Sequence, residues 1–228
     1  MNKGLFIAGT DTEVGKTYVT CQLIRQYRRA GVDAVGMKPV ASGMQEVDGQ
    51  WINEDVEQIW QASDEIVSRE LINQYAFTPF IAPHLAAAEA GELISLRKLG
   101  DSYALLAERA ELVIVEGAGG LMTPLNDSET FVDLIQQLDM GVVLVVAIRL
   151  GCINHALLTQ QAMQSANIRF VGWVANYPAA GLCADTQIET TLEKRLGAPC
   201  LGALSYGEFA HQAPTLDMTA ALSLAGFR

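Results

Sequence analysis

Short apolar runs alternate along this chain with stretches in which apolar residues recur at the spacing of one helix face. The apolar runs predict strands at residues 4–8, 34–38, 112–116, 142–148, 170–175 and 200–204. The stretches between them predict helices at residues 15–30, 54–62, 96–109, 131–139, 155–166 and 185–196. Strands and helices therefore alternate over most of the chain.

The last three predicted strands are continuous runs of apolar residues without polar alternation. Such runs are typical of strands that are buried on both faces. We therefore expect an α/β fold, with a mostly parallel sheet covered by helices on both faces, built as a single domain over residues 1–228. Residues 41–83 are the least regular segment, rich in Gly, Asn and Pro, and we expect active-site loops with one helix there.

The composition narrows the classes of partner. A formal net charge of −11 argues against a nucleic-acid partner, because phosphate backbones are bound by clustered Lys and Arg. The four cysteines, Cys21, Cys152, Cys183 and Cys200, lie far apart in the sequence and are expected to be reduced thiols. The apolar stretch at the N-terminus gives way to a polar loop by Gly9, too early for the hydrophobic region of a signal peptide. The longest apolar run, residues 142–148, is too short to span a membrane. We expect a cytoplasmic protein without a membrane partner.

The motif GTDTEVGKT at residues 9–17 follows the first predicted strand and leads into the first predicted helix. A glycine-rich turn at a helix start lets backbone N–H groups surround phosphate oxygens. Lys16 adds a positive charge for the outer phosphates, and the Thr17 hydroxyl can ligate Mg²⁺. Five residues separate Gly9 from Gly15, where the common pattern has four. ATP or GTP is the ligand that this loop predicts.

Polar residues follow three other predicted strands. Lys38 follows residues 34–37, Glu116 follows residues 112–115 and Asn176 follows residues 171–175. Ligands of open parallel sheets bind outside the carboxyl ends of the strands. There, a second lysine could stabilise a transferring phosphoryl group, an acidic residue could contact Mg²⁺ and a carboxamide could recognise adenine. Each residue also has an alternative without a functional role. Lys38 could be a surface lysine, Glu116 a solvated carboxylate in a turn, and Asn176 the start of a turn.

A further acidic pair lies in the sequence Asn53-Glu54-Asp55. Asn53 could cap a helix, and Glu54 and Asp55 could be favourable charges of its first turn. Either acidic side chain could instead meet a metal, and the spacing does not choose between them.

Taken together, five motifs resemble the dethiobiotin synthetase family. They are GTDTEVGKT at 9–17, KPVASG at 38–43, VEGAGG at 115–120, LGCINHA at 150–156 and GWVAN at 172–176. The resemblance runs from residue 4 to about residue 176, and the five-residue loop spacing is typical of that family. It weakens beyond Asn176, where Ser205 stands in place of the family's usual proline.

The resemblance implies a ligase of biotin biosynthesis that uses Mg²⁺ and ATP. This reaction closes a cyclic urea from 7,8-diaminononanoate and CO₂, through a carbamate and a carbamic-phosphoric anhydride. The implied catalytic residues are Lys38, Lys16 and Thr12. The implied metal ligands are Thr17, Asp55 and Glu116. The implied nucleotide-binding residues are Glu13, Val14, Gly15, Lys16, Thr17, Tyr18, Glu116, Gly117, Ala118, Gly119, Asn176 and Tyr177.

The resemblance also implies substrate contacts from Thr12, Ser42, Gly151, Cys152 and Asn154. In the family, the segment matching residues 151–154 reaches the substrate carboxylate from the neighbouring subunit. A homodimer with shared active sites follows from this analogy.

Two rival functions share the phosphate-binding scaffold. One is another amide-forming ligase, which would need a glutaminase domain that 228 residues do not accommodate. The other is an ATPase switch of the MinD or ParA kind, which carries an extra lysine where this chain has Asp11.

Overall fold

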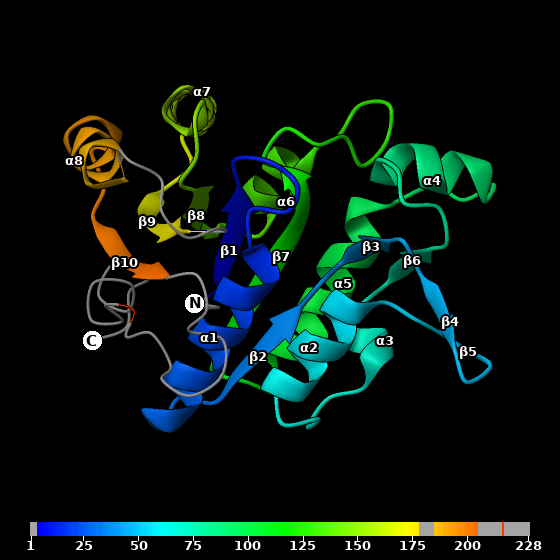
Figure 1. Ribbon diagram of the computed structural model, residues 1–228. Coiled ribbons are helices and arrows are strands. Elements are labelled where there is room, and N and C mark those ends of the chain that lie inside the picture. The colour runs from blue at the N-terminus through cyan, green and yellow to red at the C-terminus, as the bar shows by residue number, and fades with distance from the viewer. Residues whose placement is uncertain (1–3, 178–184, 205–215, 217–228) are drawn as a thin grey trace.

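A six-stranded parallel sheet forms the centre of the computed structural model, which describes residues 4–177, 185–204 and 216 (Figure 1). Its strands, in spatial order, are β10 (Cys200–Leu204), β9 (Phe170–Asn176), β8 (Gly141–Ala147), β1 (Gly4–Gly9), β7 (Leu112–Gly120) and β2 (Ala34–Met37). All six predicted strands are therefore confirmed, together with the parallel α/β class.

Helices cover both faces of this sheet. The described helices are α1 (Lys16–Arg29), α2 (Glu54–Ala62), α3 (Arg69–Ile72), α4 (Pro83–Glu89), α5 (Leu96–Ala107), α6 (Phe131–Gln137), α7 (Cys152–Ser165) and α8 (Asp185–Leu196). The chain crosses from β1 to β2 in one direction and from β7 through β8 and β9 to β10 in the other. Because such crossovers are right-handed, α1 lies on one face and α6, α7 and α8 lie on the opposite face.

Side-chain packing agrees with this assignment. Gly36 of β2 faces Ile24 of α1 and Ile59 of α2, whereas Gly4 of β1 faces Tyr103 of α5 on the other side of the sheet. Every residue of β1 and β8 is buried. Burial on both faces explains why these strands are apolar without alternation.

Residues 41–83 contain more regular structure than the sequence predicts. Here β3 (Val40–Ser42) pairs in parallel with β6 (Tyr75–Phe77), and β4 (Gln45–Val47) forms an antiparallel hairpin with β5 (Gln50–Ile52). The segment also holds α2 and the one-turn helix α3. The prediction of loops with one helix was therefore wrong in part, because strands of three residues are too short to show a hydrophobic period. Asp48-Gly49 lies between β4 and β5, with φ of 52° and 78°. An Asp-Gly pair is a sequence feature that predicts such a hairpin turn.

Two element boundaries affect the site. Helix α7 begins at Cys152, three residues before the predicted start at residue 155, because Gly151 takes a left-handed conformation (φ 93°) that ends the preceding turn. Strand β7 continues to Gly120, so Glu116 lies inside a strand and is not in a turn after it.

The topology places β1 at the centre of the sheet, between β7 and β8. The connection to β2 leaves on one side of β1, and the later strands follow on the other. The carboxyl end of β1 therefore opens into the crevice where the strand order reverses, the usual ligand site of open α/β sheets. None of the described helices is long and apolar enough to cross a membrane.

Candidate active site

The loop between β1 and α1 has the geometry of a phosphate-binding loop. Glu13 and Gly15 both have positive φ, of 57° and 89°, and α1 begins immediately after Gly15. A side chain at Gly15 would lie 2.2 Å from Nδ2 of Asn176, which itself donates a hydrogen bond of 2.8 Å to the Val14 carbonyl. Glycine is therefore required at position 15 by both conformation and space. The loop directs the N-terminus of α1 towards an anion.

Lys16 lies across this loop. Its Nζ donates a hydrogen bond of 2.9 Å to the carbonyl oxygen of Asp11, and its side chain is buried. Burial, together with repulsion from Lys38, lowers the pKa of Lys16 to about 8. Among the described residues, Lys16 forms no ion pair with a carboxylate, so its ammonium group could pair with phosphate oxygens.

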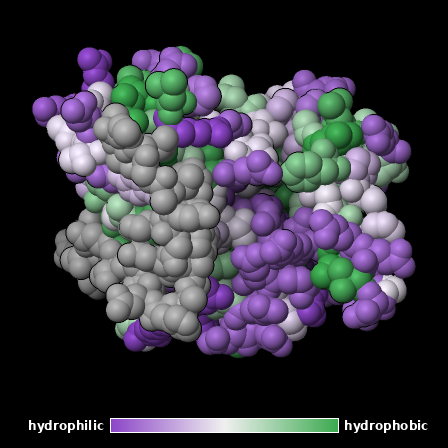
Figure 2. Space-filling view, viewed as in Figure 1, coloured by the Kyte–Doolittle hydropathy of each residue, from purple (hydrophilic) through white to green (hydrophobic). Residues whose placement is uncertain are grey.

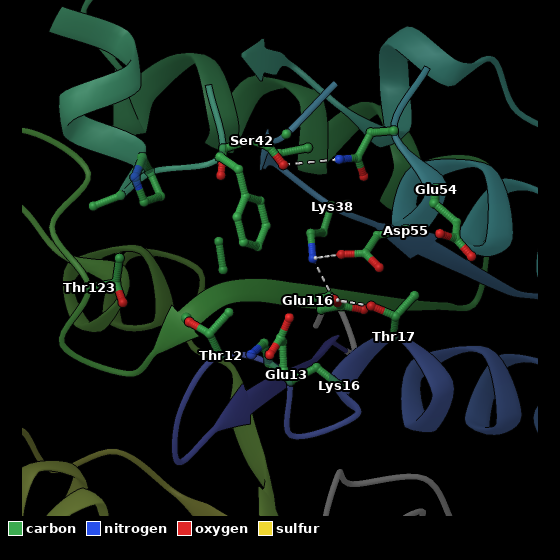
Figure 3. A pocket seen from close by; sticks show the side chains of 18 of the residues that line it. Thr12, Glu13, Lys16, Thr17, Lys38, Ser42, Glu54, Asp55, Glu116 and Thr123 are labelled. Carbon is green, nitrogen blue, oxygen red and sulfur yellow. Dashed lines mark hydrogen bonds and ion pairs between the residues drawn. The ribbon is translucent and has the colours of Figure 1, made fainter. Parts of the chain in front are cut away.

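Lys38 joins two acidic side chains into one network (Figure 3). Its Nζ donates to Oδ2 of Asp55 at 2.9 Å and to Oε1 of Glu116 at 2.5 Å. The same Oε1 accepts a hydrogen bond of 2.8 Å from the Thr17 hydroxyl. Lys38 directly follows β2, and the other three residues come from α2, β7 and α1, so four separate parts of the chain converge on one point.

The charges of this network stabilise one another. Burial alone would lower the pKa of Lys38, but Glu116 and Asp55 together raise it above its usual range. Burial likewise opposes ionisation of Asp55, but the charge and hydrogen bond of Lys38 outweigh it and lower the pKa of Asp55. Lys38 and Asp55 are therefore both charged near neutral pH.

The structure separates Asp55 from Glu54, which the sequence left as alternatives. Asp55 faces Lys38, whereas Oε1 of Glu54 accepts a hydrogen bond of 3.0 Å from Gln58 on the same helix. Asn53 caps this helix, because its Oδ1 accepts a hydrogen bond from the Val56 backbone. The register of α2 therefore aims Asp55 at the network.

The oxygen atoms of Thr17, Asp55 and Glu116 fit a magnesium ion. Oε2 of Glu116 is buried without a hydrogen-bond partner among the described residues. Among the described residues, no group of three or more His, Cys, Asp and Glu side chains is placed so that it could hold a metal. Mg²⁺ is commonly held by one or two carboxylates together with phosphate oxygens. The donor set thus fits a metal that arrives with a nucleotide.

A cavity of about 820 Å³ opens beside the loop and the network. Eleven of the residues predicted for the site line it: Thr12, Glu13, Gly15, Lys16, Thr17, Lys38, Ser42, Asp55, Glu116, Ala118 and Gly119. Its other walls come from residues that sequence reasoning did not assign, including Gln45, Asn53, Thr123 and the segment from Phe80 to Pro83. Except for Thr123, these residues lie within residues 41–83, where active-site loops are expected, but no motif marks them individually.

Comparisons with known proteins identify the family. A family model described as an AAA domain matches residues 3–211. The ATP-dependent dethiobiotin synthetase of Nitrosospira multiformis is 49% identical over 208 residues, which cover 91% of this chain and 90% of the relative. That of Aromatoleum aromaticum is 44% identical over 202 residues, covering 88% and 89%. The chain belongs to the dethiobiotin synthetase family. This confirms the resemblance carried by the five motifs.

Solved structures agree with a P-loop NTPase-like fold for this chain. A ParA family ATPase from Chlorobium tepidum superposes with a TM-score of 0.54 at 16% identity, covering 99% of this chain and 92% of that one. The signal recognition particle receptor FtsY from Elizabethkingia anophelis gives 0.51 at 14% identity, covering 99% and 65%. At these identities the likeness concerns the fold alone.

The remaining residues predicted from the dethiobiotin synthetase pattern lie outside the cavity walls: Val14, Tyr18, Gly117, Asn176, Tyr177, Gly151, Cys152 and Asn154. Gly117 packs against the Phe6 ring, and Asn176 supports the phosphate loop. Ser205, where the family pattern weakens, lies outside the described residues.

The turn before α7 contacts the phosphate loop through an ion pair. An amino group of Arg149 lies 2.7 Å from Oδ2 of Asp11. Asp11 is the position where ATPases of the MinD and ParA kind carry a lysine, and in this chain it pairs with an arginine of its own subunit. Next to Arg149, Leu150 is 98% exposed. Figure 2 shows apolar side chains gathered over α7 and over α4.

Proposed function

We propose that this protein is an ATP-dependent dethiobiotin synthetase that uses Mg²⁺ and acts on 7,8-diaminononanoate and CO₂. The observation that carries the proposal is the network of Lys38, Asp55, Glu116 and Thr17 between a phosphate-binding loop and a cavity. The relatives named above are ATP-dependent dethiobiotin synthetases, and they match about nine tenths of the chain.

ATP would bind with its phosphates in the loop formed by residues 10–15. Backbone N–H groups at the start of α1 and the ammonium group of Lys16 would bind the phosphate oxygens. The segment 116–119 and Asn176 would supply further contacts to the nucleotide, together with Tyr18 and Tyr177. Asn176 lies against Gly15, which supports its place at this end of the sheet.

Thr17, Asp55 and Glu116 would hold Mg²⁺. When bound there, the ion would neutralise charge on the phosphate oxygens of ATP. The unpartnered Oε2 of Glu116 supports this assignment, because a buried carboxylate oxygen without a hydrogen bond is costly unless a ligand completes it.

The reaction begins when one amine of the substrate adds to the carbon of CO₂ and loses a proton, which gives a carbamate. A carbamate oxygen then attacks the γ-phosphorus of ATP, and the bond to the β–γ bridging oxygen breaks to release ADP. Lys16 and Lys38 both line the cavity, and they would stabilise the negative charge of the phosphoryl group during its transfer. Thr12 and Ser42 line the same cavity and would hydrogen-bond the carbamate or the diamine.

Ring closure completes the reaction. The second amine attacks the carbamoyl carbon, a C–N bond forms, and the C–O bond to the phosphoryl group breaks. The nitrogen loses one proton, which the departing phosphate takes up. The products are the cyclic urea, ADP and inorganic phosphate.

We also propose a homodimer with shared active sites, in the cytoplasm. Gly151, Cys152 and Asn154 lie outside the cavity of their own subunit and would bind the substrate carboxylate in the partner's cavity. Backbone N–H groups at the start of α7 suit an anion. Exposed apolar side chains support a subunit interface near the site. They include Leu158 of α7 with Leu150 before it, and Leu85 of α4 with Phe80 before it.

The decisive experiment measures ADP release from Mg²⁺-ATP and bicarbonate, with and without 7,8-diaminononanoate, and reads the product mass at the end. Diamine-dependent ADP release with the mass of the cyclic urea is the expected result. Equal ADP release with and without the diamine would overturn the proposed substrate. Only the proposal of a nucleotide site would then remain.

A further inference from the structure

The cavity contains three side-chain hydroxyls without a hydrogen-bond partner among the described residues. They belong to Thr12, Ser42 and Thr123. Thr12 and Ser42 already have a place in the proposed function, as contacts to the carbamate or the diamine. Thr123 has none.

Thr123 is held at the end of β7 by a tight turn. Its backbone N–H donates a hydrogen bond of 3.2 Å to the Gly120 carbonyl, and the adjacent Pro124 bridges to Thr130. These contacts fix the backbone of Thr123 against the cavity wall. The position of its hydroxyl is therefore set by the fold rather than by a free loop.

The hydroxyls of Thr123 and Thr12 converge on the same side of Gly119. A methyl group at the Gly119 α-carbon would lie 2.7 Å from Oγ1 of Thr123 and 3.7 Å from Oγ1 of Thr12. Figure 3 shows Thr123 beyond Thr12, on the side away from Thr17 and Glu116. The two hydroxyls thus border the part of the cavity that lies on the side of Thr12 away from the proposed metal.

The chemistry of the substrate requires a group in this part of the cavity. The amine that carries the carbamate must lie near Lys16 and Lys38, where the phosphoryl group arrives. The second amine sits on the adjacent carbon and must reach one face of the planar carbamoyl group, so it has to be held beside the carbamate. A hydroxyl oxygen that accepts an N–H hydrogen bond would fix this amine and leave its lone pair free to attack.

We propose that the Thr123 hydroxyl holds the second amine of the substrate for ring closure. This inference rests on the proposed function, and it assigns Thr123 to the second chemical step. The hydroxyl accepts a hydrogen bond from the amine, while the nitrogen lone pair forms the C–N bond and the phosphate leaves with the C–O electron pair. The proton that the nitrogen loses goes to the phosphate.

The test compares the amount of cyclic urea formed with the amount of ADP released. In Thr123→Val, which keeps the shape but removes the hydroxyl, we expect the ratio of urea to ADP to fall about tenfold, because the unclosed anhydride hydrolyses. Thr123→Ser should keep the wild-type ratio, because it retains the hydroxyl. Thr190→Val on α8 is the matched control, since Thr190 is exposed and its hydroxyl donates to the Thr186 carbonyl of the same helix.

Thr123→Ala repeats the measurement with a side chain that cannot crowd the cavity, in case the valine variant does not fold. An unchanged ratio of urea to ADP in the alanine variant would overturn the role of Thr123. Loss of ADP release in a folded alanine variant would also overturn this role, because Thr123 would then act before or during phosphoryl transfer and not in ring closure. If the wild type shows no diamine-dependent ADP release, the proposed function fails instead.

Discussion

The ammonium group of Lys38 donates a hydrogen bond of 2.5 Å to Oε1 of Glu116, whose side chain has no solvent exposure. Removing one partner from a buried ion pair leaves the other charge uncompensated. Lys38 balances the carboxylates in the free protein, and in the proposed function it would also stabilise the transferring phosphoryl group.

Lys38→Met should lower kcat by at least about 100-fold and change the Kd for ATP by less than about threefold, because the proposed work of Lys38 is in the transition state. Steady-state ADP release and a binding titration measure the two quantities. Lys98→Met is the control, since Lys98 lies on the surface and its Nζ donates to the Gln74 carbonyl. Turnover of Lys38→Met close to that of Lys98→Met would contradict the role.

Glu116→Gln should raise the Mg²⁺ concentration needed for half-maximal ATP binding by about tenfold, because a neutral amide keeps the shape but loses the negative charge. The measurement is a metal titration at constant ATP. Glu111→Gln, just before β7, gives the comparison, since Glu111 bonds only to the Asp33 backbone N–H. Equal midpoints in the two variants would show that Glu116 only balances Lys38.

Asn176→Ala tests whether this carboxamide recognises adenine. The structure shows its Nδ2 bonded to the Val14 carbonyl, so removal should weaken nucleotide binding in any case. If Asn176 also contacts the base, the preference for ATP over GTP should fall by about fivefold or more. Both affinities are measured for the wild type and the variant. Equal weakening of ATP and GTP would restrict Asn176 to support of the phosphate loop.

The pKa of Lys16, lowered to about 8 in the free protein, predicts a pH dependence of ATP binding. Below this pH Lys16 is protonated and attracts phosphate, and above it the free protein loses this proton and must take one up when ATP binds. The affinity for ATP should therefore fall as the pH rises above about 8, by up to about tenfold per pH unit.

Calorimetry at pH 9 in two buffers with different ionisation enthalpies measures this proton uptake. Lys16→Met should take up fewer protons and lose the pH dependence in this range. A flat affinity between pH 7 and pH 9 in the wild type would show that the pKa of Lys16 lies higher.

The main strands and helices were predictable because each carries a local signal. Strand β8, for example, is apolar at every position because helices cover both faces, and the start of α1 is marked by the motif that ends in Gly15. The hairpin of β4 and β5 was missed, since strands of three exposed residues show no period.

The candidate site was predictable as far as sequence motifs reach. Lys38 and Glu116 follow or end apolar strands, and in a parallel sheet such positions meet at one edge. The family resemblance implied Asp55, but the residue spacing did not show that Asp55 and not Glu54 pairs with Lys38, because this pairing depends on how α2 docks against β2. Thr123 carries no motif at all, and its place near Thr12 shows only in the structure, where a methyl group added at Gly119 would contact both hydroxyls.

The sequence by itself therefore determined the class of the fold, the phosphate loop and the family, because hydrophobic period and contiguous motifs are local properties of the chain. Only the tertiary structure decided which carboxylate pairs with Lys38, and which hydroxyls border the cavity. These contacts join residues that lie far apart in the chain, so they depend on the packing of whole elements and leave no local pattern.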